Sequence, residues 1–221
     1  MTRIDVYVDE AGDGPVLAGV ATVRRTRGVE ATEFTYADGF LAGRAWPISP
    51  DLPIHRARMV IEGLPGALDD SAPDAWGRNL ITRRLAAQSR DAGHVAPTPT
   101  EVDFLLGVSD ATRQGALRFQ VGASEFLAEG GDVPQLIDLD VLLDAVDRIA
   151  RDDAGDATED AVATLLDAGS GSLGGARPKA SVRDAGRLFV AKFPHRSDRW
   201  EVIRWEAVAL DLAEACGLRT P

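Results

Sequence analysis

The stretch that decides the fold is residues 170–194, which read SGSLGGARPKASVRDAGRLFVAKFP. A glycine pair, Gly174-Gly175, precedes two β-prone runs at 179–182 and 187–193, and residues 184–186 supply a turn between them. The sequence therefore predicts a β-hairpin that opens with a glycine-rich loop. Because glycine has no Cβ, such a loop can bring backbone N–H groups close to an anion such as phosphate.

Two charged side chains complete a candidate anion site after this loop. Lys192 lies on the second run and would point toward the same place, and Glu206 lies in a helix expected over residues 200–216. A glycine loop, a lysine on the next strand and an acid on the following helix form the phosphate-binding half of a protein-kinase-like lobe. The loop is neither G-x-G-x-x-G nor G-x-x-x-x-G-K-[ST], and a Gly-Gly turn also occurs as plain hairpin chemistry, so both interpretations stay open.

Several segments resemble motifs of the HipA family of bacterial serine/threonine-protein kinases, the toxins of HipA–HipB toxin–antitoxin pairs. Similarity to the start of the kinase domain lies in SLGGARPK at 172–179, FVAKFP at 189–194 and WE at 205–206. Similarity to the N-terminal subdomain lies in LPGALDDS at 64–71, WGR at 76–78, LLGVSD at 105–110 and GALRF at 115–119. The segments follow one another in the family's order, so the resemblance spans essentially the whole chain.

The resemblance implies ATP with Mg as the cofactor and assigns residues to it. Lys192 would contact the α- and β-phosphates and pair with Glu206. The loop that covers the phosphates would consist of Gly174, Gly175, Ala176, Arg177 and Lys179. Ser172 matches the family's autophosphorylated serine. Each assignment has a plainer alternative: an outward-facing lysine on an edge strand, a solvated loop arginine and a turn serine.

The resemblance also implies partners and a location. The family's catalytic aspartate, its metal ligands and its helical lobe follow the region in which this sequence ends, so we assign no catalytic and no metal-binding residue here. We expect the ATP-binding half of a kinase toxin, inactive alone, in the cytoplasm, with a HipB-like antitoxin or a separate kinase-lobe subunit as partner. The alternative is a non-enzymatic interaction or regulatory module.

Composition excludes several other classes. The 221 residues are 45% hydrophobic and carry a net charge of −11, so direct nucleic-acid binding is not expected. No run approaches about 20 apolar residues, so no membrane span is predicted. The one cysteine, Cys216, falls in a helical pattern and is expected to be a small core residue. The three histidines are far apart and give no zinc spacing.

The pattern along the chain predicts an α+β protein. Strands are expected at 3–8, 16–24, 30–36 and 115–121, and the first three form a small, strongly curved antiparallel sheet. Residues 40–53 are expected to be irregular because of their prolines. A helix is expected to begin at Ser71 as N-cap and to end at Gly93, and Thr100 with Asp103 predicts a capping box.

The second half predicts further helices and the domain organisation. Helices are expected over 138–151, from Thr158 to Gly169, and after a cap near Ser197 or Asp198. The glycine-rich segment 128–134 is the expected boundary. We therefore expect an N-terminal subdomain over 1–130, a helical connector over 131–169 and the start of a kinase domain over 170–221, a β-hairpin plus helix whose C-terminal helical lobe is absent.

Overall fold

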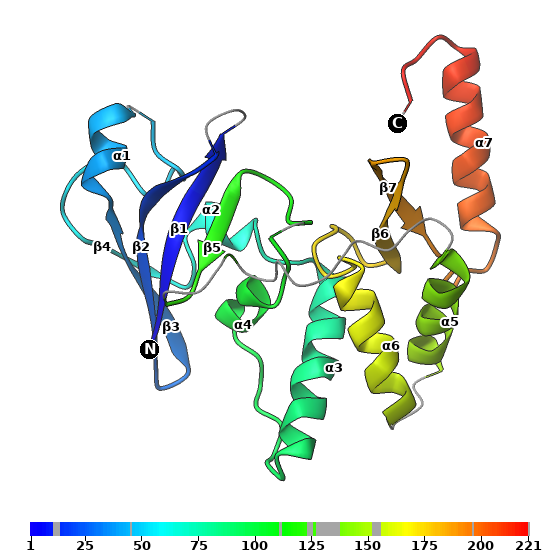
Figure 1. The fold of residues 1–221 in the computed structure, drawn as a ribbon, viewed down its shortest axis with the longest axis horizontal. Coiled ribbons are helices and arrows are strands. Elements are labelled where there is room, and N and C mark those ends of the chain that lie inside the picture. The colour runs from blue at the N-terminus through cyan, green and yellow to red at the C-terminus, as the bar shows by residue number, and fades with distance from the viewer. Residues whose placement is uncertain are drawn as a thin grey trace.

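The computed structural model describes residues 1–10, 14–44, 46–110, 112–122, 126, 138–151, 156–195 and 197–220. Figure 1 shows an antiparallel sheet with short helices at one end, a group of helices in the middle, and a hairpin with a final helix at the other end. The predicted α+β class is confirmed.

The N-terminal sheet has five strands in the order β4-β3-β2-β1-β5, and every neighbouring pair is antiparallel. Its strands are β1 (Thr2–Glu10), β2 (Gly14–Thr26), β3 (Val29–Tyr36), β4 (Met59–Glu62) and β5 (Leu117–Gln120). The β1–β2 register shifts between Val6 and Tyr7, which marks a bulge that increases the local twist. The alternation seen in the sequence sets the faces, because Ile4, Val6 and Val8 are all buried.

Short helices pack on the buried face of this sheet. These are α1 (Asp38–Gly43), α2 (Gly66–Asp69) and α4 (Glu101–Leu106), which contribute Phe40, Leu68 and Leu105 to the core. The prediction of irregular structure over 40–53 is wrong at its start, because α1 extends to Gly43. The predicted capping box of Thr100 and Asp103 is confirmed at the start of α4.

The helix α3 (Ala75–Asp91) begins later than the sequence suggested. Ser71 does not cap it, because its hydroxyl donates to the carbonyl of Ala67 and so closes the preceding helix α2. The N-cap residue of α3 is Asp74, whose side chain makes no capping bond. At the other end, Gly93 N–H and His94 N–H bond the carbonyls of Arg90 and Ser89, which is the glycine-terminated C-cap that the sequence predicts.

A second hydrophobic cluster lies beside α3. It joins this helix to α5 (Leu139–Ala150), α6 (Asp156–Asp167) and the hairpin formed by β6 (Lys179–Asp184) and β7 (Arg187–Lys192). The hairpin contributes Ala180 and Val182. Both predicted central helices are present, although α6 begins before Thr158. The expected boundary 128–134 lies outside the described residues, and the division into three regions stays a prediction.

The last helix, α7 (Val202–Ala215), is the least enclosed element. None of the side chains of α7, all of which the structure describes, is buried. Trp205 and Leu212 are 58% and 61% exposed. The predicted cap at Ser197 or Asp198 is wrong, because Glu201 occupies the N-cap position and makes no side-chain capping bond. The end at Gly217 is confirmed by a positive φ of 78°.

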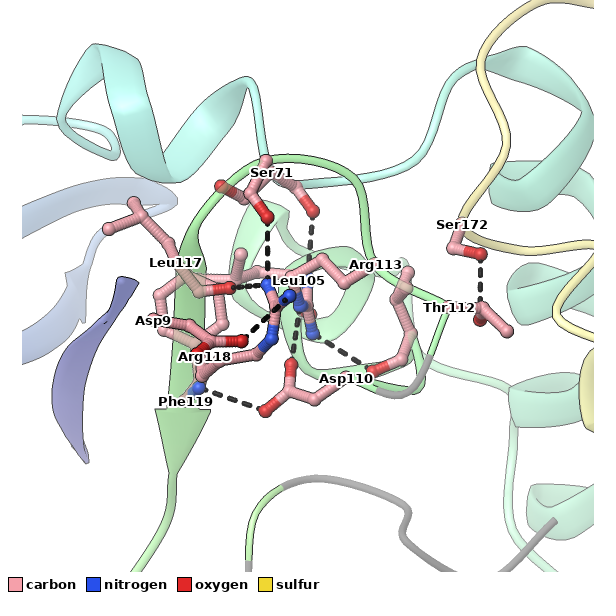
Figure 2. A network of polar contacts seen from close by, with 12 residues as sticks. Asp9, Ser71, Leu105, Asp110, Thr112, Arg113, Leu117, Arg118, Phe119 and Ser172 are labelled. Atoms are coloured by element: carbon pink, nitrogen blue, oxygen red, sulfur yellow. Dashed lines mark hydrogen bonds and ion pairs between the residues drawn. The ribbon is translucent and has the colours of Figure 1, made fainter. Parts of the chain in front are cut away.

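A buried ion pair fixes the loop between α4 and β5. Arg113 donates from Nε to Asp110 Oδ1 at 2.5 Å, and its other nitrogens donate to the carbonyls of Ser71, Leu105 and Val108 (Figure 2). The second carboxylate oxygen of Asp110 accepts the N–H of Phe119 on β5. Arg113 and Asp110 together thus connect the segment after α2, the helix α4 and strand β5.

Among the helices that the structure describes, none combines the length and the apolar character needed to cross a membrane.

Candidate nucleotide-binding site

The hairpin places the two lysines of the chain opposite each other. Lys179 and Lys192 are the only lysines in the sequence. They form a directly opposed pair in the β6–β7 ladder, so their side chains project from the same face of the hairpin. Two ammonium groups side by side repel each other unless an anion lies between or beside them.

Glu206 supplies one such negative charge. Lys192 Nζ donates to Glu206 Oε1 and forms an ion pair from β7 to α7, across 14 residues of sequence. Both side chains are partly exposed, at 46% and 38%, so the pair is accessible from solvent. The structure brings Lys192 and Glu206 together as the sequence pattern suggested.

Lys179 lies in a different environment from its neighbour. The residue is buried, and its Nζ donates to the backbone carbonyl of Gly174. Burial lowers the pKa of Lys179 below its ordinary value, the Asp74 carboxylate opposes this effect, and the nearby Lys192 reinforces it. A phosphate oxygen would stabilise a partly desolvated ammonium that lies beside a second ammonium.

The glycine loop is shaped by the start of α3. Gly175 has a φ of +98°, and a Cβ built on it would lie 2.8 Å from Lys179 Nζ. Its N–H donates to Asp74 Oδ2 at 2.5 Å, and its carbonyl accepts the N–H of Trp76 at 3.3 Å. Both polar groups of the Gly175 backbone are therefore bonded to the N-terminal end of α3. Asp74, one of the two partners, lies 101 residues earlier in the sequence.

A second contact holds the same loop against α3. A Cβ built on Gly77 would lie 2.4 Å from the carbonyl oxygen of Gly171, which is closer than real Cβ atoms approach. Only glycine therefore fits at position 77 without moving the loop. The sequence motif WGR at 76–78 thus has a structural reason: its glycine admits the segment that leads into the hairpin.

Ser172, two residues before Gly174, is buried at 8% exposure. Its Oγ donates to the carbonyl of Gly169 at 2.7 Å and lies 2.8 Å from Thr112 Oγ1, a contact drawn in Figure 2. This hydroxyl does not face solvent, so its modification would require the loop to leave the position seen here.

The remaining loop residues are exposed. Ala176 and Arg177 lie at its tip, and Arg177 pairs with Asp198 at 2.6 Å. Asp198 also accepts the backbone N–H of His195, and this bond, together with Arg177, keeps the pKa of Asp198 below its ordinary value despite an opposing desolvation effect. Arg177 therefore anchors the loop to the segment before α7.

Two further sequence expectations concern cysteine and metal. Cys216 is exposed, so its expected place in a core is wrong: α7 packs no face into either cluster, and its end is solvated. Among the described residues, no group of three or more His, Cys, Asp or Glu side chains is arranged to hold a metal ion.

Sequence reasoning missed the role of Asp74. The predicted N-cap at Ser71 places Asp74 inside the first turn of the helix and gives it no partner outside that helix. No signal in the sequence connects Asp74 with Gly175, because the contact depends on how α3 packs against a loop about a hundred residues later.

The fold and this geometry define an α+β protein in which a small antiparallel sheet domain is joined to a hairpin–helix unit carrying a lysine–glutamate pair. Residues 17–96 match the family model described as the HipA N-terminal domain. Over residues 17–96 the chain is therefore similar to the HipA N-terminal domain, in agreement with the motifs of its N-terminal half. The searches of curated proteins and of solved structures gave no match to this chain.

Proposed function

We propose that the hairpin, its glycine loop and α7 bind the phosphates of ATP, as the nucleotide-binding half of a HipA-type serine/threonine-protein kinase. The HipA N-terminal domain supports a toxin-related protein in a toxin–antitoxin context. The observation that carries the nucleotide proposal is the pairing of Lys179 with Lys192 on one face, with Glu206 neutralising only Lys192. Glu206 pairs directly with Lys192, whereas the Asp74 carboxylate acts on Lys179 through space, so a phosphate could replace Asp74 as the negative charge near Lys179.

Each residue has a part in the proposed site. Lys192, oriented by Glu206, would contact the α- and β-phosphates, and Lys179 would approach from the facing strand. Gly174, Gly175 and Ala176 would cover the phosphates with backbone N–H groups, and Arg177 would close the edge of the loop. The nucleotide would bring its own Mg, and turnover would need a catalytic base and metal ligands from a kinase-lobe region.

Isothermal titration with MgATP tests this proposal. We expect saturable binding by the native chain and at least a tenfold loss of affinity in Lys192→Met. Arg183→Met is the matched control, because Arg183 is an exposed cation on the same hairpin, and its affinity should stay unchanged. Equal affinity in all three proteins, or no heat of binding in any of them, would contradict the proposal.

A specific observation also favours a second function, an interaction module. Large apolar side chains are exposed on both β7 and α7: Leu188, Val190, Trp205, Val208 and Leu212. A surface of this kind is typical of a protein contact, and a separate kinase-lobe subunit or a HipB-like antitoxin is the partner that the family suggests. Binding of such a protein, lost in Trp205→Ser, would support this candidate.

A further inference from the structure

Asp74 is a carboxylate whose position is not explained by its own helix. It occupies the N-cap position of α3, where an aspartate usually accepts an N–H of the first helical turn, yet its side chain makes no such bond. Its Oδ2 instead accepts the N–H of Gly175 at 2.5 Å. The acid is therefore directed at the glycine loop and away from the helix that it begins.

This bond occupies a group that the proposed nucleotide site needs. A backbone amide has a single hydrogen to donate, so the Gly175 N–H cannot bond a phosphate while it is bonded to Asp74. The negative charge also reaches the lysine pair, because Asp74 stabilises the charged form of Lys179. The Asp74 carboxylate thus supplies the negative charge and the hydrogen-bond acceptor that a phosphate oxygen would supply to Gly175 and Lys179.

The space beside the loop agrees with this. Asp74, Gly174 and Ser172 line a hollow of about 80 Å³. Pockets that hold nucleotide-sized ligands are typically about 300–1,000 Å³. The loop in this position is held by Asp74, Trp76 and Thr112 of the N-terminal region, and the hollow beside Asp74 is too small for a nucleotide. Its lining residues do not include Lys179, Lys192 or Glu206.

We propose that Asp74 is an intramolecular competitor of the nucleotide phosphates, an autoinhibitory contact through which the N-terminal region holds the glycine loop closed. This inference rests on the proposed nucleotide binding and adds a regulatory residue to it. The nucleotide must displace the carboxylate from Gly175, so a change that draws α3 away from the loop opens the site.

The experiment compares MgATP affinity in Asp74→Ala and Asp74→Asn with that of the native chain by isothermal titration. Removing one negative charge from beside the phosphates should tighten binding about three- to tenfold in Asp74→Ala. Asp74→Asn, whose side-chain oxygen still accepts the Gly175 N–H without the charge, should fall between. Asp70→Asn is the matched control: it removes a charge from the same hollow and should leave the affinity within about twofold of native.

A second measurement does not depend on nucleotide. The exchange rate of the Gly175 amide hydrogen, followed by NMR, should rise at least tenfold in Asp74→Ala and stay native in Asp70→Asn. Unchanged exchange would overturn the contact itself. If the native chain and Asp74→Ala bind MgATP equally, the competition is refuted and the nucleotide site stands; if neither binds, both proposals fail. If Asp74→Ala does not fold, the MgATP affinity of Asp74→Asn is compared with that of the native chain instead.

Discussion

Arg113 and Asp110 form an ion pair that is almost completely buried, with side-chain exposures of 1% and 4% and an Nε–Oδ1 distance of 2.5 Å. The guanidinium also donates to three backbone carbonyls and stacks over the ring of Phe119 at 4.7 Å. The charge is therefore surrounded by acceptors contributed by the segment after α2, by α4 and by the loop before β5 (Figure 2).

Breaking this pair should be strongly destabilising. Arg113→Met leaves the Asp110 carboxylate buried without its counter-ion, so we expect the free energy of unfolding to fall by about 3–5 kcal/mol. Urea denaturation followed by circular dichroism measures it. Arg3→Met, which removes a largely exposed pair with Asp5, is the control and should change the stability by less than about 1 kcal/mol. A similar small loss in both variants would contradict the prediction.

Glu206→Gln should separate binding from stability. The pair with Lys192 is partly exposed, so its loss should lower the free energy of unfolding by no more than about 1 kcal/mol. If Glu206 orients Lys192 toward a phosphate, MgATP affinity should fall several-fold in the same variant. Titration calorimetry and urea denaturation of one preparation give both values. Glu201→Gln, an acid at the exposed start of α7 that pairs with Arg204, should keep native affinity.

Lys179 should make stability depend on pH in a defined direction. Burial lowers its pKa in the folded protein below the ordinary value of 10.5, so the unfolded chain binds this proton more tightly. The protonated lysine therefore reduces stability below its folded pKa, and this penalty disappears as the pH rises toward 10.5. Lys179→Met should be more stable than the native chain at pH 7, and the difference should shrink toward pH 10. Thermal melts at both pH values provide the measurement, and a difference that grows with pH would refute it.

Ser172 should tolerate loss of its hydroxyl better than addition of charge. Ser172→Ala removes bonds to Gly169 and Thr112 and should cost about 1 kcal/mol. Ser172→Glu places an unpaired carboxylate at a buried position and should cost more, by releasing the loop from Thr112. Thermal unfolding compares the two variants. Ser197→Glu, at an exposed position before α7, is the control and should hardly change the melting temperature. If Ser172→Glu lowered the melting temperature no more than Ser197→Glu, the Ser172 hydroxyl would not be buried.

Gly77→Ala tests whether the loop depends on the close approach of α3. A methyl group there would meet the Gly171 carbonyl at 2.4 Å, so the loop must shift. We expect a loss of about 1–3 kcal/mol, against the gain that alanine normally gives inside a helix. Thermal unfolding provides the readout, and a variant as stable as the native chain would show that the loop does not rest on Gly77.

The sequence predicted those features that depend on local pattern. The alternation of Ile4, Val6 and Val8 predicted a half-buried strand, and Thr100 with Asp103 predicted a capping box that forms as expected. The hairpin followed from its turn, in which Ala185 and Gly186 both have positive φ. In each case the decisive residues lie within a few positions of one another.

The failures concern features that the local pattern does not fix. Ser71 has the chemistry of an N-cap, but its hydroxyl donates to the carbonyl of Ala67, four residues earlier, and so closes α2. Cys216 lies in an apolar pattern, yet α7 buries no side chain within the described part of the chain. The partner of Asp74 lies 101 residues away, and no spacing rule connects them. The Lys192–Glu206 pair could be predicted because only a short connecting segment and the start of α7 separate the two residues in the sequence.

The scarcity of lysine has a practical consequence for anyone handling this protein. Amine-reactive dyes and ester-activated sensor surfaces can couple only to the N-terminal amine and to Lys179 and Lys192, which face each other on the hairpin. Routine immobilisation or fluorescent tagging through side-chain amines would therefore attach the protein through the very face proposed to receive phosphate. Coupling through the exposed thiol of Cys216 avoids those amines.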